Sequence, residues 1–324
     1  MPARLALIHN PRSRLNLRDA GAFVAQAKEQ FGSLFISPDS RDELASEVRQ
    51  LAAQDIRFII VNGGDGTVSD VLSAVLACYP ADRLPALAVL PSGNTNLIAC
   101  DVGCCCRGIA ALKRLQDKAT AGTLLDAANW RQPVVVSWSD AGRMPVAGMF
   151  CGLAAFTRGI ELAHNPAILN RYSHDMAVFA TVLWAIRRLF QRKTRRAWLD
   201  GTPMTLTVDD EMPDERPRFL VLCTGLHRLS RGVWPFWQNH ASAGGLAYLD
   251  ILANPPGLAR NLFCVLRGRL PGRLRKSAAY RSGMAAKLRI ETHDRLVMDG
   301  EELDTGSDGQ IWLTQGPRVA FIRA

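Results

Sequence analysis

Apolar positions in the first 125 or so residues alternate between short continuous runs and runs at helical spacing. The continuous runs predict strands at Leu5–His9, Leu34–Ser37, Phe58–Asn62 and Ala86–Leu90. Helical spacing predicts a helix over Asp19–Phe31 and another after Ser40, where Ser40 and Glu43 form a capping box. The alternation predicts a doubly wound, Rossmann-like α/β domain on a parallel sheet. Such domains bind ligands at the carboxyl ends of their strands.

From about Ala127 the apolar runs become short and are separated by turn residues. This pattern of short apolar runs and turns predicts a mostly antiparallel sheet or β-sandwich. The runs are Val134–Trp138, Met204–Val208, Phe219–Cys223, Ala247–Leu252, Leu288–Glu291, Ile311–Leu313 and Arg318–Ile322, and a long helix candidate, Ser173–Trp198, interrupts them. We expect two closely packed domains, because 324 residues with 48% apolar content exceed what one core usually fills.

The strand at Phe58 runs into a glycine-rich turn, Asn62–Thr67, and then into an amphipathic helix. Glycines let backbone N–H groups face an anion, and the helix adds the positive end of its dipole. The turn therefore predicts a phosphate site. An acid held inside it, Asp65, is a poor phosphate contact and indicates a magnesium ion, bound directly or through water.

Charge and composition narrow the class of protein. Lysine plus arginine exceed aspartate plus glutamate by 39 to 30, a net +9 that favours an anionic partner: nucleotide, nucleic acid or acidic membrane. The start of the chain lacks a signal-peptide layout, so we expect a cytoplasmic protein. The longest apolar run, Met176–Ile186, is far short of the roughly 20 residues of a spanning helix, so we expect membrane contact to be peripheral.

The cysteines narrow the class of protein less than the charge does. Eight cysteines without a secretion signal are expected to be reduced thiols. The cluster of Cys100, Cys104, Cys105 and Cys106 admits a metal site, but small apolar packing is the favoured interpretation because no second ligand pair follows.

Four segments carry candidate chemistry: His9–Ser13, Gly63–Thr67, Leu90–Asn96 and Met298–Glu301. The first and the last of these segments also have plain structural interpretations. Asn10 with Pro11 suits a turn, and Asp299 with Gly300 suits a hairpin turn. Glu301 suits an exposed strand position, and His9 suits a structural role.

Together, in this order and spacing, the four segments resemble the diacylglycerol kinase catalytic-domain superfamily, which includes YegS-like lipid kinases, sphingosine kinases and ceramide kinases. The resemblance implies a nucleotide-binding α/β domain of the NAD kinase and diacylglycerol kinase type over residues 1–126, to which about 306–324 return. It also implies a β-rich lipid-substrate domain over 127–305 and a nucleotide site in the cleft.

The resemblance also implies roles for individual residues, with ATP and Mg²⁺ as cofactors. The cofactor-binding set is Asn10, Pro11, Ser13, Ser37, Gly63, Gly64, Asp65, Gly66, Thr67, Gly93, Asn94, Asn96 and Glu301, with Asp65 as the metal ligand. Asp299 matches the carboxylate proposed as base in bacterial diacylglycerol kinases. In sphingosine kinases that role usually goes to the acid of the glycine turn, here Asp65, so the two assignments compete.

Two departures bear on the acceptor. Many bacterial members carry an acid two residues after Thr95, where this chain has Leu97. They also carry an aspartate that holds a structural magnesium, whereas the nearest segment here, His240–Leu246, has no acid. Both departures favour a sphingoid-type or ceramide-type acceptor over phosphatidylglycerol or diacylglycerol, and the missing aspartate argues against a second, structural magnesium site.

Two basic runs suit docking on anionic lipid at the inner face of the membrane, although charged runs are usually solvated faces. They are Arg187–Arg196 and Arg267–Lys276. Trp234–Trp237 suits either core packing or the rim of a lipid entrance. We therefore expect an ATP-dependent lipid kinase. A soluble NAD-kinase-like enzyme and a non-catalytic lipid-binding relative stay open as alternatives, and no nucleic-acid-binding motif accompanies the charge.

Overall fold

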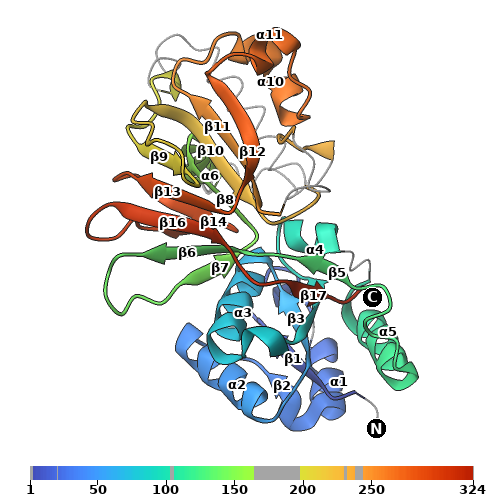
Figure 1. Ribbon diagram of the computed structural model, residues 1–324. Coiled ribbons are helices and arrows are strands. Elements are labelled where there is room, and N and C mark those ends of the chain that lie inside the picture. The colour runs from blue at the N-terminus through green and yellow to red at the C-terminus, as the bar shows by residue number, and fades with distance from the viewer. Residues whose placement is uncertain are drawn as a thin grey trace. The chain divides into compact units, whose positions relative to one another are not determined.

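The structure is a computed structural model that describes residues 3–19, 21–102, 106–163, 198–229, 232–237 and 244–323. The chain forms two compact units (Figure 1). Unit 1 comprises residues 1–133, 146–148 and 317–324, and unit 2 comprises residues 134–145 and 149–316. The predicted helix before Trp198, the run Arg187–Arg196, Cys104, Cys105 and His240–Ala243 lie outside the described residues.

Unit 1 is built on a six-stranded sheet in the order β2-β1-β3-β4-β17-β5. The strands are β1 (Leu5–His9), β2 (Phe35–Ile36), β3 (Phe58–Gly63), β4 (Ala86–Pro91), β5 (Asn129–Arg131) and β17 (Val319–Phe321). Neighbours pair in parallel, except that β17 and β5 are antiparallel. All of β1 and β4, and all of β3 after Phe58, are buried, as in sheets covered on both faces.

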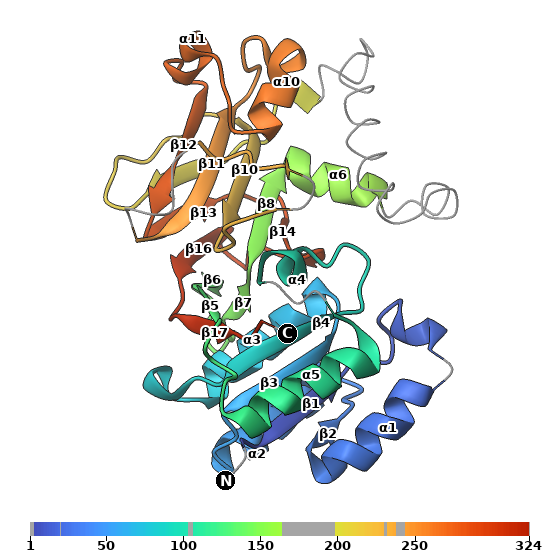
Figure 2. The ribbon, with the colours of Figure 1, turned by 90° about the vertical axis from the view of Figure 1, so that its right-hand side faces the viewer.

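Helices cover this sheet (Figure 2). They are α1 (Ala22–Phe31), α2 (Arg41–Ala53), α3 (Asp65–Cys78), α4 (Leu97–Val102) and α5 (Gly108–Ala121), with 3-10 turns η1 (Asn16–Arg18), η2 (Gly32–Leu34) and η3 (Ala81–Arg83). Phe23 of α1 and Leu112 of α5 share one apolar core with Leu7 of β1, and α2 packs against α3. The predicted doubly wound α/β fold is confirmed.

Unit 2 contains two antiparallel sheets. One runs β12-β11-β10-β8-β14-β15, and the members of the other in this unit run β6-β16-β13-β9. The strands are β6 (Val134–Trp138), β8 (Phe150–Ala154), β9 (Thr205–Val208), β10 (Arg218–Thr224), β11 (Leu246–Leu252), β12 (Tyr280–Ala285), β13 (Lys287–Glu291), β14 (Leu296–Met298), β15 (Glu301–Leu303) and β16 (Gln310–Gln315). The predicted antiparallel architecture is confirmed.

Three described helices accompany these sheets: α6 (Ala155–Ala163), α10 (Leu258–Leu266) and α11 (Gly272–Arg275). Helix α6 packs on β8, β10 and β14. Burial alternates along β6 and β9, which indicates that the smaller sheet buries one face. Within the described part of the chain, no helix combines the length and apolar character needed to cross a bilayer.

The division into units differs from the expected boundaries at 126 and 306. Strand β5 lies in unit 1 because it pairs with β17, which itself pairs with β4. Strand β16 lies in unit 2 because it pairs with β6 and β13. The short strand β7 (Val146–Gly148) also belongs to unit 1, where the Ala147 N–H donates to Ser73 Oγ of α3 at 2.8 Å.

Candidate functional site

The carboxyl ends of β1, β3 and β4 lie side by side in unit 1. Their register pairs His9 with Asn62 and Gly63 with Pro91, so the three following loops leave the sheet at one edge. Strand β2 pairs with β1 in the same direction, which brings the loop of Ser37 to that edge as well. The predicted segments of unit 1 are therefore neighbours in space.

A buried polar network ties the three strand ends together. Asn62 Nδ2 lies 3.0 Å from His9 Nδ1, and Ser92 Oγ donates to Asn62 Oδ1. The His9 ring lies between the rings of Phe23 and Phe35. Burial lowers the pKa of His9, with the charge of Asp19 opposing the shift, which suits a neutral ring that accepts a hydrogen bond. His9 thus has the structural role that the sequence favoured.

The first loop is fixed to the helix that follows β3. Asn10 Nδ2 donates to Thr67 Oγ1 at 2.8 Å, and the Asn10 N–H donates to Asn62 O at 3.0 Å. Asn16 Nδ2 donates to Asn10 O at 2.8 Å. Asn10 therefore links two of the predicted nucleotide segments, and its amide does more than close a turn.

The two glycine turns touch each other backbone to backbone. A Cβ built at Gly93 would lie 2.5 Å from the Cα of Gly64, and one at Gly64 would lie 3.0 Å from the Cα of Gly93. A Cβ at Gly63 would lie 2.5 Å from the Cβ of Thr67. None of the three glycines has a left-handed backbone, so their conformation does not require glycine. Glycine is required because a Cβ at these positions would prevent the close approach.

Helix α3 begins with open backbone amides. Gly64 is its N-cap, and no side chain caps the helix. The first intrahelical bond runs from the Val68 N–H to Gly64 O, so the amides of Asp65, Gly66 and Thr67 precede the helical ladder. Open amides at a helix start beside glycines form a site for phosphate.

Helix α4, in contrast, begins with its amides already satisfied. The Leu97 N–H donates to Asp65 Oδ2 at 2.9 Å, and the Ile98 N–H donates to Asp65 Oδ1 at 3.0 Å. Burial raises the pKa of Asp65, and these two bonds oppose the shift. The Asp65 carboxyl group therefore caps α4, and Asp65 is also the first residue of α3.

The loop between β4 and α4 is shaped by Asn96. The Gly93 N–H donates to Asn96 Oδ1 at 2.8 Å, and Asn96 Nδ2 donates to Gly93 O at 3.0 Å. Asn96 adopts a left-handed backbone, φ 49°. Its side chain is committed to the loop, whereas Asn94 is exposed.

Asp299 lies in unit 2 at the turn between β14 and β15. Its φ of 48° and the 93° of Gly300 form the left-handed pair of a two-residue hairpin. The Met149 N–H donates to Asp299 Oδ2 at 2.7 Å, and the Phe150 N–H donates to Asp299 Oδ1 at 3.0 Å. Both oxygens thus hold the start of β8.

The other predicted residues differ in burial. Ser13 is buried, Pro11 is half-buried and Ser37 is exposed, all in unit 1, while Glu301 is exposed on β15 of unit 2. Sequence reasoning included Asn62 and Ser92 in candidate segments without giving either a role of its own, and it missed Asn16 altogether. The signal for Asn62 and Ser92 was a polar residue at the end of a buried strand or just beyond one.

Among the described residues, no group of three or more histidine, cysteine, aspartate or glutamate side chains is arranged to hold a metal ion. Cys100 is exposed and Cys106 is half-buried, with Arg114 Nη1 donating to Cys106 Sγ at 2.7 Å. Of the predicted aromatic segment, Phe236 is buried and packs edge-on against Trp234.

Residues 4–125 match the family model of the diacylglycerol kinase catalytic domain. Two Escherichia coli proteins, of O1:K1 / APEC and of O9:H4 (strain HS), are both named "Probable lipid kinase YegS" and are 35% identical to this chain over 102 residues. That stretch is 32% of this chain and 33% of each relative, so the chain matches about a third of their length.

Solved structures resemble the whole chain. A "putative diacylglycerol kinase" from Bacillus anthracis str. Sterne has a TM-score of 0.63 at 18% identity, covering 99% of this chain and 97% of that one. A second structure of that description has a TM-score of 0.62 at 16% identity, covering 99% of this chain and 95% of the other. At this identity the likeness supports the fold alone.

Proposed function

We propose, from the premise that residues 4–125 belong to the diacylglycerol kinase catalytic-domain superfamily, that this chain is an ATP-dependent lipid kinase. It would transfer the γ-phosphate of ATP to a lipid hydroxyl. The observation that carries the proposal is the start of α3, where a glycine turn precedes three amides that come before the helical ladder and the N-cap residue, Gly64, supplies no side-chain cap. The neighbouring helix α4 lacks this property because Asp65 caps it.

The nucleotide phosphates would lie on the amides of Asp65, Gly66 and Thr67, which precede the helical ladder of α3. Asn10 supports this position because it holds the Thr67 hydroxyl at 2.8 Å. Gly93 keeps the second turn close enough to Gly64 that no side chain intrudes. Phosphoryl transfer depends on positioning and charge neutralisation more than on covalent help, so no catalytic lysine is needed.

For a magnesium ion, the first turn of α3 offers one carboxylate. Asp65 is the acid in the first turn of α3, and each of its oxygens already accepts one α4 amide. The remaining lone pairs can reach a hydrated ion, which suits Mg²⁺ because it keeps waters and binds substrate phosphates. The ion would neutralise phosphate charge when bound, and Asp65 would hold it, directly or through water.

For the base we propose Asp299, which would accept the proton of the lipid hydroxyl. The amides of Met149 and Phe150 hold its carboxylate in one orientation, and fixed geometry is what a general base needs. Asp65 would instead hold the ion in this proposal; its two oxygens each accept one backbone amide, as those of Asp299 do, so the amide contacts alone do not separate the two carboxylates.

The acceptor we propose is a lipid alcohol on an anionic membrane surface. Leu97 stands where many bacterial members of the superfamily carry an acid, and its N–H donates to Asp65. We therefore place a sphingoid base or ceramide ahead of diacylglycerol.

The test incubates the purified protein with labelled ATP and Mg²⁺ against sphingosine, ceramide, diacylglycerol and NAD, each offered separately. We expect label in one lipid and none in NAD. Label in NAD alone would replace the lipid kinase by a soluble NAD-kinase-like enzyme. Nucleotide-independent lipid binding with no label in any acceptor would indicate a non-catalytic lipid-binding protein.

A further inference from the structure

The segment from Ile251 to Tyr280 in unit 2 has an unusual charge. It contains six basic residues and no aspartate or glutamate, in a chain whose net charge is +9. The six are Arg260, Arg267, Arg269, Arg273, Arg275 and Lys276. This short segment therefore supplies most of the excess positive charge, and it contains α10 and α11.

The outward side of α10 is a stripe of arginine, phenylalanine and arginine. Arg260, Phe263 and Arg267 follow each other at spacings of three and four residues, which places them on one side of the helix. Phe263 is 64% exposed, and the Arg267 guanidinium lies 4.2 Å from the centre of its ring. Phe263 therefore presents most of its ring to solvent, with a cation one turn away on either side.

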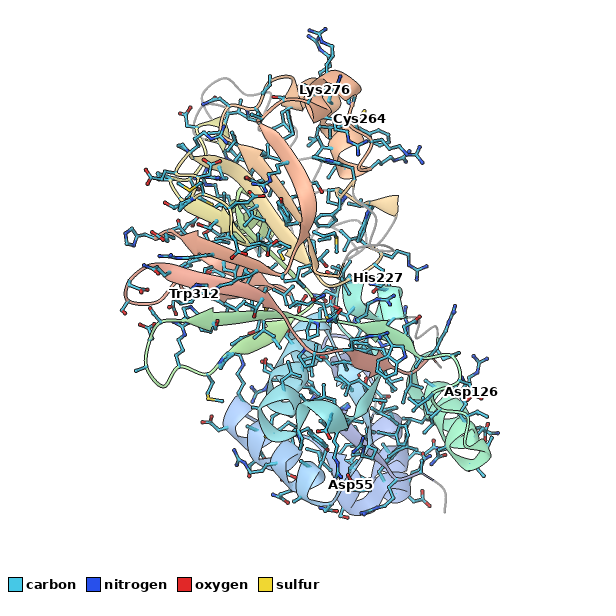
Figure 3. The ribbon with its side chains drawn as sticks, viewed as in Figure 1. Asp55, Asp126, His227, Cys264, Lys276 and Trp312 are labelled. Carbon is cyan, nitrogen blue, oxygen red and sulfur yellow. The ribbon has the colours of Figure 1, made fainter. Side chains whose placement is uncertain are left out.

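The basic side chains continue beyond α10. Arg269, Arg273, Arg275 and Lys276 are all exposed. Figure 3 labels Cys264 on α10 and Lys276 by α11, and the side chains around them end in nitrogen atoms that point outward. Among the described residues, none of the six cations forms an ion pair with a carboxylate, whereas Arg281 farther on pairs with Glu211 at 2.5 Å. Their charge is thus not neutralised within this part of the chain.

The opposite side of α10 is firmly attached to unit 2. Leu258 and Val265 are buried, and the Trp234 N–H donates to Leu266 O at 2.8 Å. Gly268 packs against the carbonyls of Trp234 and Phe236, where a Cβ would lie 2.7 and 2.6 Å from the two oxygens. The stripe is therefore presented on a fixed helix and needs no partner to fold.

We propose that the α10–α11 face, defined as Phe263 with these six cations, docks the protein on an anionic lipid bilayer. The inference rests on the proposed function in one respect, because a kinase for a lipid must meet its acceptor at a membrane. Cations attract the lipid headgroups, and an exposed ring flanked by arginines can enter the interface while the guanidinium groups stay with phosphate. A nucleic acid would use the charge but gain little from Phe263.

The test measures sedimentation with vesicles of phosphatidylglycerol and phosphatidylcholine, in the absence of nucleotide. The variant R267E/R273E/R275E should lose at least about 100-fold in vesicle affinity, since each cation near an anionic surface is worth about fivefold. F263S should lose several-fold while keeping the salt dependence of the wild type. Wild-type protein should not bind vesicles of phosphatidylcholine alone.

Matched controls lie elsewhere on the surface. R49E/R83E/K113E makes the same change in net charge on exposed residues of unit 1, and M212S removes an 87% exposed apolar side chain of unit 2. Both should bind vesicles like the wild type. Equal losses in the controls, or an F263S variant with unchanged vesicle binding, would overturn the proposal, as would tighter binding of the wild type to duplex DNA than to vesicles.

Failure of this proposal can be told apart from failure of the kinase proposal. A short-chain acceptor dispersed without vesicles needs no docking, so R267E/R273E/R275E should phosphorylate it at the wild-type rate. Vesicle binding that depends on the α10–α11 face would support the docking proposal even if no lipid were phosphorylated. Phosphorylation without such binding would keep the kinase and remove the docking face.

Discussion

Helices α3 and α4 start at neighbouring glycine turns of one sheet, yet their starts are chemically opposite. The first amides of α4 donate to the Asp65 carboxylate, whereas α3 has no side-chain cap. Asp65 is the first residue of α3, and its side chain accepts the first two amides of α4. Because a phosphate needs free helix amides, a glycine-rich strand-to-helix turn is a candidate phosphate site only where no acidic side chain already accepts those amides.

The strongest test of this comparison is Gly93→Ala. Its Cβ would lie 2.5 Å from the Cα of Gly64, so one of the two turns must move. We expect a loss of about 2–3 kcal/mol in the free energy of unfolding and about 10²-fold in turnover, because small misplacements at a reacting centre are costly. Denaturant unfolding and nucleotide titration measure both.

Gly159→Ala is the matched control, since nothing lies within 4 Å of a Cβ at that position in α6. It should be as stable as the wild type or slightly more so. A Gly93→Ala variant that binds ATP normally would show that contact between the two turns is dispensable.

Asp299→Asn tests whether the general base is Asp299, which lies outside the two glycine turns. We expect a fall in turnover of about 10²-fold or more with nearly unchanged nucleotide affinity. One of the Met149 and Phe150 amides would then face an amide NH₂ group, so stability must be measured alongside. Asp210→Asn, at an exposed site in unit 2, is the control. Turnover at the wild-type level would remove Asp299 from the mechanism.

Asp65→Asn tests the side-chain cap at the start of α4. One α4 amide loses its acceptor, so we expect a loss of about 1–3 kcal/mol in the free energy of unfolding. Burial raises the pKa of Asp65, so the folded chain holds this proton more tightly than the unfolded chain. Wild-type stability conferred by this group therefore falls as pH rises from about 4 through the raised pKa.

The Asp65→Asn variant lacks this pH dependence of the free energy of unfolding. The difference in the free energy of unfolding between wild type and variant should therefore be larger at about pH 4 than at about pH 7. Chemical unfolding at several pH values measures it, with exposed Asp117→Asn as control. A gap that stays constant with pH would contradict the raised pKa. Activity retained at limiting magnesium would count against Asp65 as a metal ligand.

The smallest expected effect belongs to an ordinary helix cap. Ser40 Oγ accepts the Glu43 N–H at 3.1 Å at the start of α2, and Glu43 Oε2 accepts the Asp39 N–H at 2.6 Å. Ser40→Ala should cost about 1 kcal/mol in the free energy of unfolding and leave ATP affinity unchanged. A change in ATP affinity would mean that helix starts at this edge cannot be assigned separate roles.

Local sequence determined much of unit 1. Four apolar runs predicted β1 to β4 within one or two residues, and Ser40 with Glu43 marked the start of α2, because these signals depend on neighbours along the chain. The strands β8 and β12 of unit 2 were missed. Their glycines and Cys151 break the expected pattern, and Tyr248 covers Gly283 only in the folded sheet.

The sequence alone therefore determined which turns hold glycine, which residues follow the strands and which superfamily the motifs resemble. Tertiary structure decided what those groups do. Only folding brings Leu97 and Ile98 to the Asp65 carboxylate, sets Gly93 against Gly64, and gives Asp299 the amides of Met149 and Phe150. The physical reason is that a carboxylate's partners are selected by distance in space, which a linear pattern does not specify.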